Sequence, residues 1–289
     1  MKLFRFFSFL FSLSLLLVFI AGCENTDLEL ATEAGLEALN AVTLTDEQVH
    51  QISLRAASEV DGKNQVAEPS NSYAKRLNKL VSAHQEENGI SYNYKVYIDP
   101  TVNAFAMADG TIRVYSGLMD MLDDGELRFV IGHEMGHVAQ KHIKKKLMLA
   151  YVGSAVRKGV ASQDNVAGDI ARSGLGGLIE SLVNAQFSQQ EEREADDYGL
   201  IFLKQKGYQA PKAISALQKL ATLGNNHSFL SSHPAPGKRA ERLETIMNSP
   251  ESAPSEEETS LVDDLLALLG SLWEKLSALL GDLLPKSGG

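Results

Sequence analysis

The segment His133-Glu134-Met135-Gly136-His137 constrains this chain more than any other stretch, because it reads H-E-x-x-H within a helical pattern. Four residues of α-helix advance about 400°, so His133 and His137 leave the same face about one turn apart. Two imidazoles at this spacing can bind one Zn²⁺, and Glu134 can take a proton from a water on the metal. Such a short pattern also arises by chance, so a third ligand must be found elsewhere in the chain.

Candidates for the third ligand lie in a second helical stretch, residues 188–198, which is dense in carboxylates. Glu192 and Asp196 are four residues apart, so one could bind the metal while the other reaches a ligand histidine. A catalytic zinc site takes three protein ligands, an open position for water, and a carboxylate that fixes an imidazole tautomer. A run of acids is also typical of a solvated helix face, and spacing does not choose between Glu191, Glu192 and Glu194.

Four motifs occur together in this chain: H-E-M-G-H, S-x-x-x-E-x-x-A-D at 188–196, N-A-F-A…G…G-L at 103–118, and H-P-x-x-x-x-R at 233–239. Together they resemble the M48 family of zinc metallopeptidases. The resemblance covers about residues 40 to 248. Many members carry Arg after the Ser of the second motif, where this chain has Gln189, and we do not interpret this change as loss of activity.

The resemblance implies roles for the residues of the metal site. His133, His137 and Glu192 would bind one Zn²⁺ per chain, and Glu134 would be the catalytic base. Asp196 would orient a ligand imidazole without binding the metal itself.

Two further elements acquire roles from the same resemblance. His233 would lie near the cleft, where it either stabilises the oxyanion or occupies the open position of zinc in a closed form. Arg239 would stand behind the ligands or anchor that loop. Proteases commonly hold an extended substrate as an added strand on a sheet edge. The residues expected to bind substrate in this way are Asn103, Ala104, Phe105 and Ala106.

The predicted fold class is α+β. Alternation and turn residues predict strands at residues 92–98, 104–107 and 111–115, the last two joined by a hairpin at Asp109-Gly110. A helix is predicted over 71–88 with Leu77, Leu80 and Val81 on its buried side, and helices follow the hairpin. With the resemblance, this gives a mostly helical, zincin-like (gluzincin) metallopeptidase domain with a small sheet beside the active-site helix.

The N-terminal residues predict export. An apolar run from Phe6 to Ile20 is shorter than the roughly 20 residues that cross a membrane, and it is followed by Ala21-Gly22-Cys23. Small residues before a cleavage point mark a signal peptide, and this ending resembles a bacterial lipobox. We therefore expect acylation of Cys23, and Glu24 resembles the sorting signal for the outer membrane.

The remaining composition limits the partners. A net charge of −10 argues against nucleic acid. Leucines at three- and four-residue steps predict an amphipathic helix over 261–285. Its polar face is acidic, whereas a membrane-surface helix usually carries Lys or Arg. We therefore expect it to contact an envelope protein or its own copy.

The other histidines have weaker signals. His142 comes nine residues after His133, about 900° of helix, which predicts that it faces away from the metal. The basic run at 141–146 is interpreted as cations at the C-terminus of the metal helix. No pattern supports a role for His50, His84 or His227.

The expected organisation has five parts: a lipoprotein signal peptide (1–22), an N-terminal tether and helical segment (23–70), an M48 metallopeptidase domain (71–248), an acidic linker (249–260) and the leucine-rich helix (261–285). The expected function is that of a zinc endopeptidase, lipid-anchored in the outer membrane and facing the periplasm, which cleaves unfolded or misassembled envelope proteins. The alternative is a metal-stabilised chaperone or adaptor lipoprotein for outer-membrane protein assembly, with little proteolytic activity.

Overall fold

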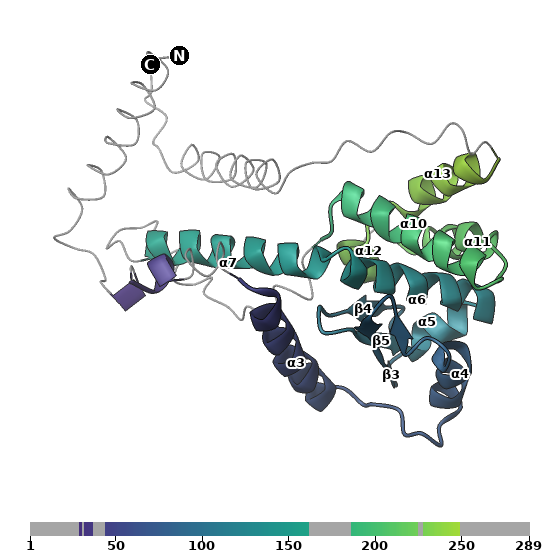
Figure 1. Cartoon of the computed structure of the whole chain (residues 1–289), viewed down its shortest axis with the longest axis horizontal. Helices are drawn as coiled ribbons and strands as arrows, with labels where there is room; N and C mark the ends of the chain where they lie inside the picture. Colours follow the sequence, from purple (N-terminus) through teal and green to yellow (C-terminus); the bar gives the residue numbers. More distant parts are fainter. Residues whose placement is uncertain (1–28, 31, 37–43, 162–185, 225–227, 249–289) are drawn as a thin grey trace, which may run out of the picture. The chain divides into compact units, whose positions relative to one another are not determined.

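The computed structural model describes residues 29–30, 32–36, 44–161, 186–224 and 228–248 (Figure 1). The signal peptide, Cys23, His227, the acidic linker and the leucine-rich helix lie outside these ranges. The chain divides into two compact units, and the second, Thr45–Leu149 with Val183–Gly289, holds the predicted site. Within the described ranges, no helix has both the length and the apolar character that a membrane crossing requires.

A three-stranded sheet has the order β3-β5-β4, where β3 is Asn93–Tyr97, β4 is Ala104–Ala106 and β5 is Thr111–Tyr115. Strands β4 and β5 are antiparallel, with Phe105 opposite Arg113, and β3 is parallel to β5. The predicted hairpin is confirmed. Its Gly110 has a φ of 86°, and a Cβ there would lie 2.0 Å from the Ser91 carbonyl oxygen. Only glycine fits this turn.

A second, smaller hairpin corrects the predicted helix over 71–88. Helix α4 (Ser72–Val81) ends at Val81, and its buried side carries Leu77, Leu80 and Val81 as expected. Strands β1 (Glu86–Glu87) and β2 (Ile90–Ser91) then pair across Asn88-Gly89. Both turn residues have positive φ, 53° and 76°. Asn-Gly is the usual signal for such a two-residue turn, so the sequence contained the information that ends this helix.

Helices make up most of the rest, and the predicted mostly helical α+β fold is confirmed. They are α3 (Asp46–Lys63), α5 (Ser116–Met121), α6 (Asp124–Ala139), α7 (His142–Ala161), α10 (Gln189–Gln205), α11 (Lys212–Leu220), α12 (Ser228–Ser232) and α13 (Pro236–Asn248). Helix α6 carries the H-E-x-x-H segment and lies between the sheet and helices α10 and α11 (Figure 1). It is therefore covered on both sides.

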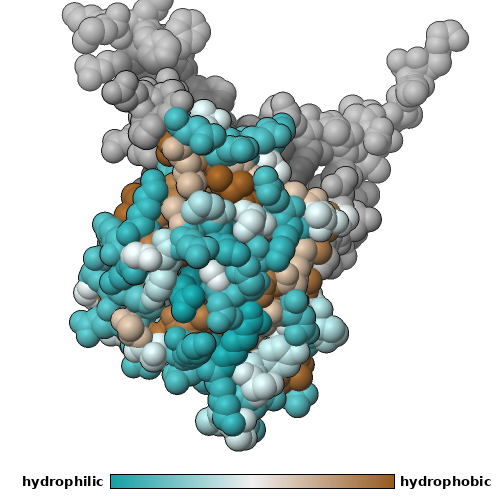
Figure 2. Space-filling model, turned by 90° about the vertical axis from the view of Figure 1, so that its right-hand side faces the viewer, coloured by the Kyte–Doolittle hydropathy of each residue, from teal (hydrophilic) through white to brown (hydrophobic). Residues whose placement is uncertain are grey.

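The described part of the chain exposes few large apolar side chains. Among the described residues, the exposed ones are Leu36, Leu54 and Ile201. Figure 2 shows one face, which is mostly hydrophilic with small apolar patches. Single exposed hydrophobic residues are normal for a soluble domain, so they do not define a docking surface.

A buried ion pair connects α3 to the sheet. The Arg113 side chain is 2% exposed, and its Nε and Nη2 donate to the Asp61 carboxylate at 2.7 and 2.9 Å. Tyr97 and Lys95 donate to the same carboxylate at 2.6 and 2.7 Å. Burial alone would raise the pKa of Asp61, but these hydrogen bonds hold that pKa well below its usual range. Asp61 is therefore ionised at any pH at which the protein functions.

Replacing Asp61 by Asn should destabilise the fold by about 3 kcal/mol, because it leaves the buried Arg113 charge without a carboxylate, while its Nη1 keeps hydrogen bonds to neutral groups of Asn93 and Ile112. The wild-type contribution should be present above the unfolded pKa of about 4 and be lost as the pH falls through the lower folded pKa. Urea unfolding from pH 7 to pH 3 measures both effects. Asp46→Asn, which removes exposed pairs with Lys141 and Lys144, is the control and should leave the unfolding free energy unchanged. Equal effects of the two substitutions would contradict this account.

Candidate active site

Helix α6 begins at a capping box, in which Asp123 accepts from the backbone N–H groups of Gly125 and Glu126. Its second half buries three side chains that carry polar chemistry. His133, Glu134 and His137 are 2%, 1% and 0% exposed. Burying such groups costs free energy unless each has a hydrogen-bond partner or binds a metal, so the residues around them show which role they have.

Three side chains bring donor atoms to one point. His133 Nε2 lies 3.1 Å from His137 Nε2, and Glu192 Oε1 lies 3.3 Å from His137 Nε2. Glu192 Oε2 is 3.8 Å from His133 Nε2. Ligands bound tetrahedrally to Zn²⁺ at 2.0–2.1 Å lie about 3.4 Å apart, so these separations fit one ion.

The structure distinguishes the three candidate glutamates on α10. Glu191 closes the capping box that begins this helix, where its side chain accepts from the Ser188 N–H at 2.8 Å. Glu194 accepts from His142 at 2.7 Å. Glu192 is the one that reaches the two imidazoles.

One carboxylate oxygen of Glu134 lacks a hydrogen-bond partner in the described part of the chain. Its Oε1 is buried and makes no hydrogen bond to any described residue. The nearest ionic contact is His233 Nε2, at 3.6 Å. A buried carboxylate oxygen without a donor is costly, so this atom fits a role in which a water or a metal-bound group completes the site.

Asp196 and Arg239 stand behind the donor atoms. Asp196 Oδ1 lies 3.0 Å from His133 Nδ1, and Arg239 donates to both Asp196 oxygens at 2.8 and 2.6 Å. Arg239 also contacts Glu192 Oε2. Burial alone would raise the pKa of both carboxyl groups, but the Arg239 charge lowers each pKa below its usual value. Both acids are thus held as anions in the interior.

His233 lies in the loop between α12 and α13 and joins the cluster. Its Nδ1 is 2.9 Å from Glu192 Oε1 and 3.3 Å from His133 Nε2. One potential ligand atom from each of His133, His137, Glu192 and His233 lies within 4.8 Å of all the others. Ala235, two residues on, has a φ of 53°, a left-handed conformation that strains a residue with a Cβ.

Residues 69–247 match the model of peptidase family M48. This chain belongs to that family. It is 45% identical to metalloprotease LoiP of Escherichia coli (strain K12) over 233 residues, which cover 80% of this chain and 92% of LoiP. It is 40% identical to metalloprotease YcaL of the same organism over 230 residues, which cover 78% of this chain and 91% of YcaL. The chain is therefore an M48 metalloendopeptidase with its His133, His137 and Glu192 site intact.

Two residues beside the M48 site were not predicted to contact it. The expectation that His142 faces away is wrong, because α6 ends at Ala139 and Lys141 has a φ of 59°. The chain turns there, and His142 Nδ1 lies 2.9 Å from His137 Nδ1. Phe187 stacks on the His137 ring with centroids 3.7 Å apart. The residue before the N-cap Ser188 is Phe187, but the fourth residue of the helix is Glu192 and not an apolar one, so no hydrophobic staple marked Phe187 in the sequence.

The same turn corrects the interpretation of the basic run. Residues 142–146 open α7 rather than close α6, so they do not act as cations at the C-terminus of α6. Lys141 and Lys144 each pair with Asp46 at 2.7 Å. Lys146 lies over the Phe187 ring, and burial lowers the pKa of its ammonium group to about 8.

Strand β4 offers a free edge next to the M48 helix. Asn103 and Met107 make backbone bonds to β5, and alternation along the strand directs the backbone groups of Ala104 and Ala106 to the opposite side. Among the described strands, none pairs with that side. The Ala104 N–H donates to no strand in the described part of the chain and instead donates to the Asn103 side-chain oxygen at 3.0 Å. The strand packs against α6.

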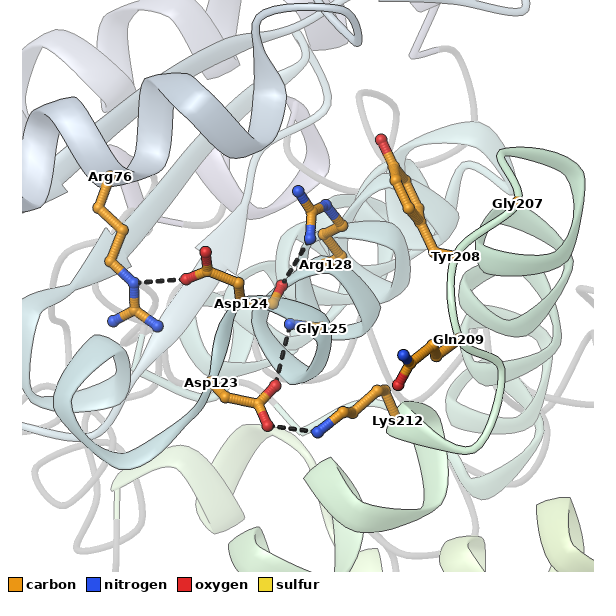
Figure 3. A pocket seen from close by; sticks show the side chains of 9 residues that line it. All are labelled: Arg76, Asp123, Asp124, Gly125, Arg128, Gly207, Tyr208, Gln209 and Lys212. Carbon is orange, nitrogen blue, oxygen red and sulfur yellow. Dashed lines mark hydrogen bonds and ion pairs between the residues drawn. The ribbon is translucent and has the colours of Figure 1, made fainter.

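A surface pocket of about 700 Å³ lies at the other end of α6 (Figure 3). Most of its charges are paired, since Arg76 pairs with Asp124 at 2.8 Å and Lys212 pairs with Asp123, while the Arg128 guanidinium lies over the Tyr208 ring. Asp124 is nine residues before His133, about 13 Å along the helix. We therefore assign this pocket to helix packing and not to catalysis.

Gly136, inside the H-E-x-x-H segment, should be essential for the approach of α10. A Cβ on it would lie 3.0 Å from the Ala195 Cα and 2.9 Å from the Tyr198 Cβ. Gly136→Ala should therefore push the helices apart, destabilise the fold by about 1–3 kcal/mol and weaken metal binding. The control is Gly62→Ala on α3, where a Cβ meets nothing within 4 Å and helix propensity favours Ala by about 1 kcal/mol. Denaturant unfolding compares the two, and an unchanged midpoint for Gly136→Ala would refute the close-contact argument.

Proposed function

We propose that this chain is a zinc endopeptidase, lipid-anchored through Cys23 on the periplasmic face of the outer membrane, and that it cleaves unfolded or misassembled envelope proteins. The observation that carries the chemistry is the buried donor set of His133, His137 and Glu192 beside the unpartnered oxygen of Glu134. The lipobox-like sequence before Cys23 supports the anchor.

In the proposed mechanism, His133, His137 and Glu192 hold one Zn²⁺. The bound ion supplies Lewis acidity toward a water molecule and the scissile carbonyl. Glu134 accepts the proton of the attacking water and then delivers it to the leaving amine. Glu134 is suited to this role because its Oε1 is buried beside the donor cluster with no hydrogen bond of its own.

Asp196 and Arg239 keep His133 in the correct tautomer. A carboxylate accepts from an N–H, so Asp196 favours the proton on Nδ1 of His133 and leaves the Nε2 lone pair for the metal. The two hydrogen bonds from Arg239 fix the Asp196 carboxylate in place.

The substrate is expected to extend along β4. The outward backbone groups of Ala104 and Ala106 would pair with an extended chain, with Asn103 and Phe105 flanking them. Because β4 packs on α6, a peptide added there would pass beside the residues that cleave it.

We also propose that the arrangement described here is a latent form. His233 places its Nδ1 among the donor atoms, where it would be a fourth ligand to the metal. The left-handed Ala235 stores about 1–2 kcal/mol of backbone strain in the same loop, which would be released if the loop moved. His233 would thus block the open position of the metal and would not stabilise the oxyanion in this form.

Glu134→Gln should retain zinc but lose cleavage of unfolded casein by at least about 10²-fold, because the proton acceptor is removed while the ligands stay. Metal content and product masses are measured on the same preparation, with chelator-treated wild type as the reference for no activity. If this variant cleaved casein at the wild-type rate, the proposed mechanism would be wrong. If the variant still relieves an envelope-stress defect, the chaperone or adaptor function is favoured instead.

His233→Ala should raise the rate of casein cleavage at saturating zinc, by about tenfold if the open form is one-tenth populated in the wild type. The same substitution should weaken zinc binding, because one ligand is lost. Steady-state rates and zinc titration give the two readouts. A fall in rate with unchanged metal content would show that His233 stabilises the oxyanion.

A further inference from the structure

A chain of hydrogen bonds runs from the metal ligand His137 to the helix that carries Glu192. His142 Nδ1 lies 2.9 Å from His137 Nδ1, and His142 Nε2 lies 2.7 Å from Glu194 Oε2. Gln190 donates to the other oxygen of Glu194 at 2.8 Å. His142 is 3% exposed, so water does not substitute for these contacts. The turn at Lys141 brings the side chain here.

Only one placement of the protons on the imidazole rings of His137 and His142 is compatible with a metal on His137 Nε2. Two facing Nδ1 atoms form a hydrogen bond only if one carries the proton and the other does not. If His137 Nε2 gives its lone pair to a metal, the neutral ring must carry its proton on Nδ1. His142 Nδ1 then accepts, the neutral His142 ring carries its proton on Nε2, and that N–H donates to the Glu194 carboxylate.

We propose that His142 and Glu194 are positioning residues for His137. They fix the orientation and tautomer of this ligand, as Asp196 and Arg239 do for His133. Each imidazole ligand thus has its own carboxylate on α10, Asp196 directly and Glu194 through His142. The inference rests on the proposed zinc site, since it assigns His137 Nε2 to the metal.

The test compares His142→Leu with His142→Asn. Leu removes both hydrogen bonds, and it should lower zinc affinity about 10- to 100-fold. Asn can place an amide oxygen near the lost Nδ1 and accept from His137, so it should recover part of this loss. Glu194→Gln should also lower the affinity, because the charged acceptor for His142 is gone. Zinc affinity is measured by competition with a metal-binding dye, and the visible spectrum of the Co²⁺-loaded protein reports the ligand geometry.

His84→Asn is the matched control. His84 is another buried histidine, 4% exposed, whose Nδ1 meets Glu87 at 2.7 Å and whose Nε2 meets the Tyr208 hydroxyl at 2.9 Å. Its loss should lower the unfolding temperature of the metal-free protein and leave zinc affinity and the Co²⁺ spectrum unchanged. A merely structural role for His142 would give the same result as this control.

The proposal is overturned if His142→Leu and Glu194→Gln bind zinc within twofold of wild type, or if His84→Asn weakens binding as much as they do. If His142→Leu does not fold, His142→Asn and Glu194→Gln decide the question. Failure of the wild type and of His84→Asn to bind zinc would instead overturn the proposed zinc site, and this inference with it.

Discussion

Three carboxylates are buried in the interior between α6 and α10, and the fold must supply them with compensating positive charge. Glu134, Glu192 and Asp196 are each at most 1% exposed. Arg239, itself buried, is in direct contact with Glu192 and Asp196, and the Lys146 ammonium group interacts electrostatically with Glu134 and Glu192. A metal ion held by the two imidazoles and Glu192 would add positive charge to this acidic interior, in agreement with the donor geometry.

Close helix packing brings these groups together. Where α6 and α10 cross, Gly132, Gly136 and Gly199 leave no room for a Cβ without contact below 3.2 Å. Both helices begin at capping boxes, which fix where each starts and therefore which residues face each other at the crossing. The ligand set depends as much on these small residues and caps as on the histidines and acids that form it.

The sequence predicted those features of the fold and the site that depend on interactions between neighbouring residues. The common face of His133 and His137 and the Asp109-Gly110 hairpin each depend on a few neighbouring residues. The selection of Glu192 from its neighbours depends on how α10 rotates against α6, which the family resemblance supplied and spacing did not. The predicted orientation of His142 is wrong because it assumes that the helix of His133 continues to residue 142. The chain turns at Lys141, and neither Gly nor Pro marks this turn in the sequence. The Asn88-Gly89 turn, in contrast, carries the usual signal of a two-residue hairpin turn, so local sequence is sufficient to end the helix before it.

The His233 ring in the proposed latent form and the carbonyl of a substrate bound along β4 would occupy the same place. His233 contacts Glu192 through Nδ1, and its Nε2 approaches Glu134 at 3.6 Å, so one ring stands between the metal ligands and the base. In this proposal, a peptide on β4 brings its carbonyl to that place, and it would therefore bind the form in which His233 has moved away. A ligand shifts such an equilibrium by its differential affinity for the two forms. The binding free energy of the substrate is thus reduced by the cost of removing His233, less the strain released at Ala235. Under the proposed latency, folded proteins, which do not present an extended strand, would form fewer backbone hydrogen bonds at β4 to offset that cost, which would favour unfolded chains.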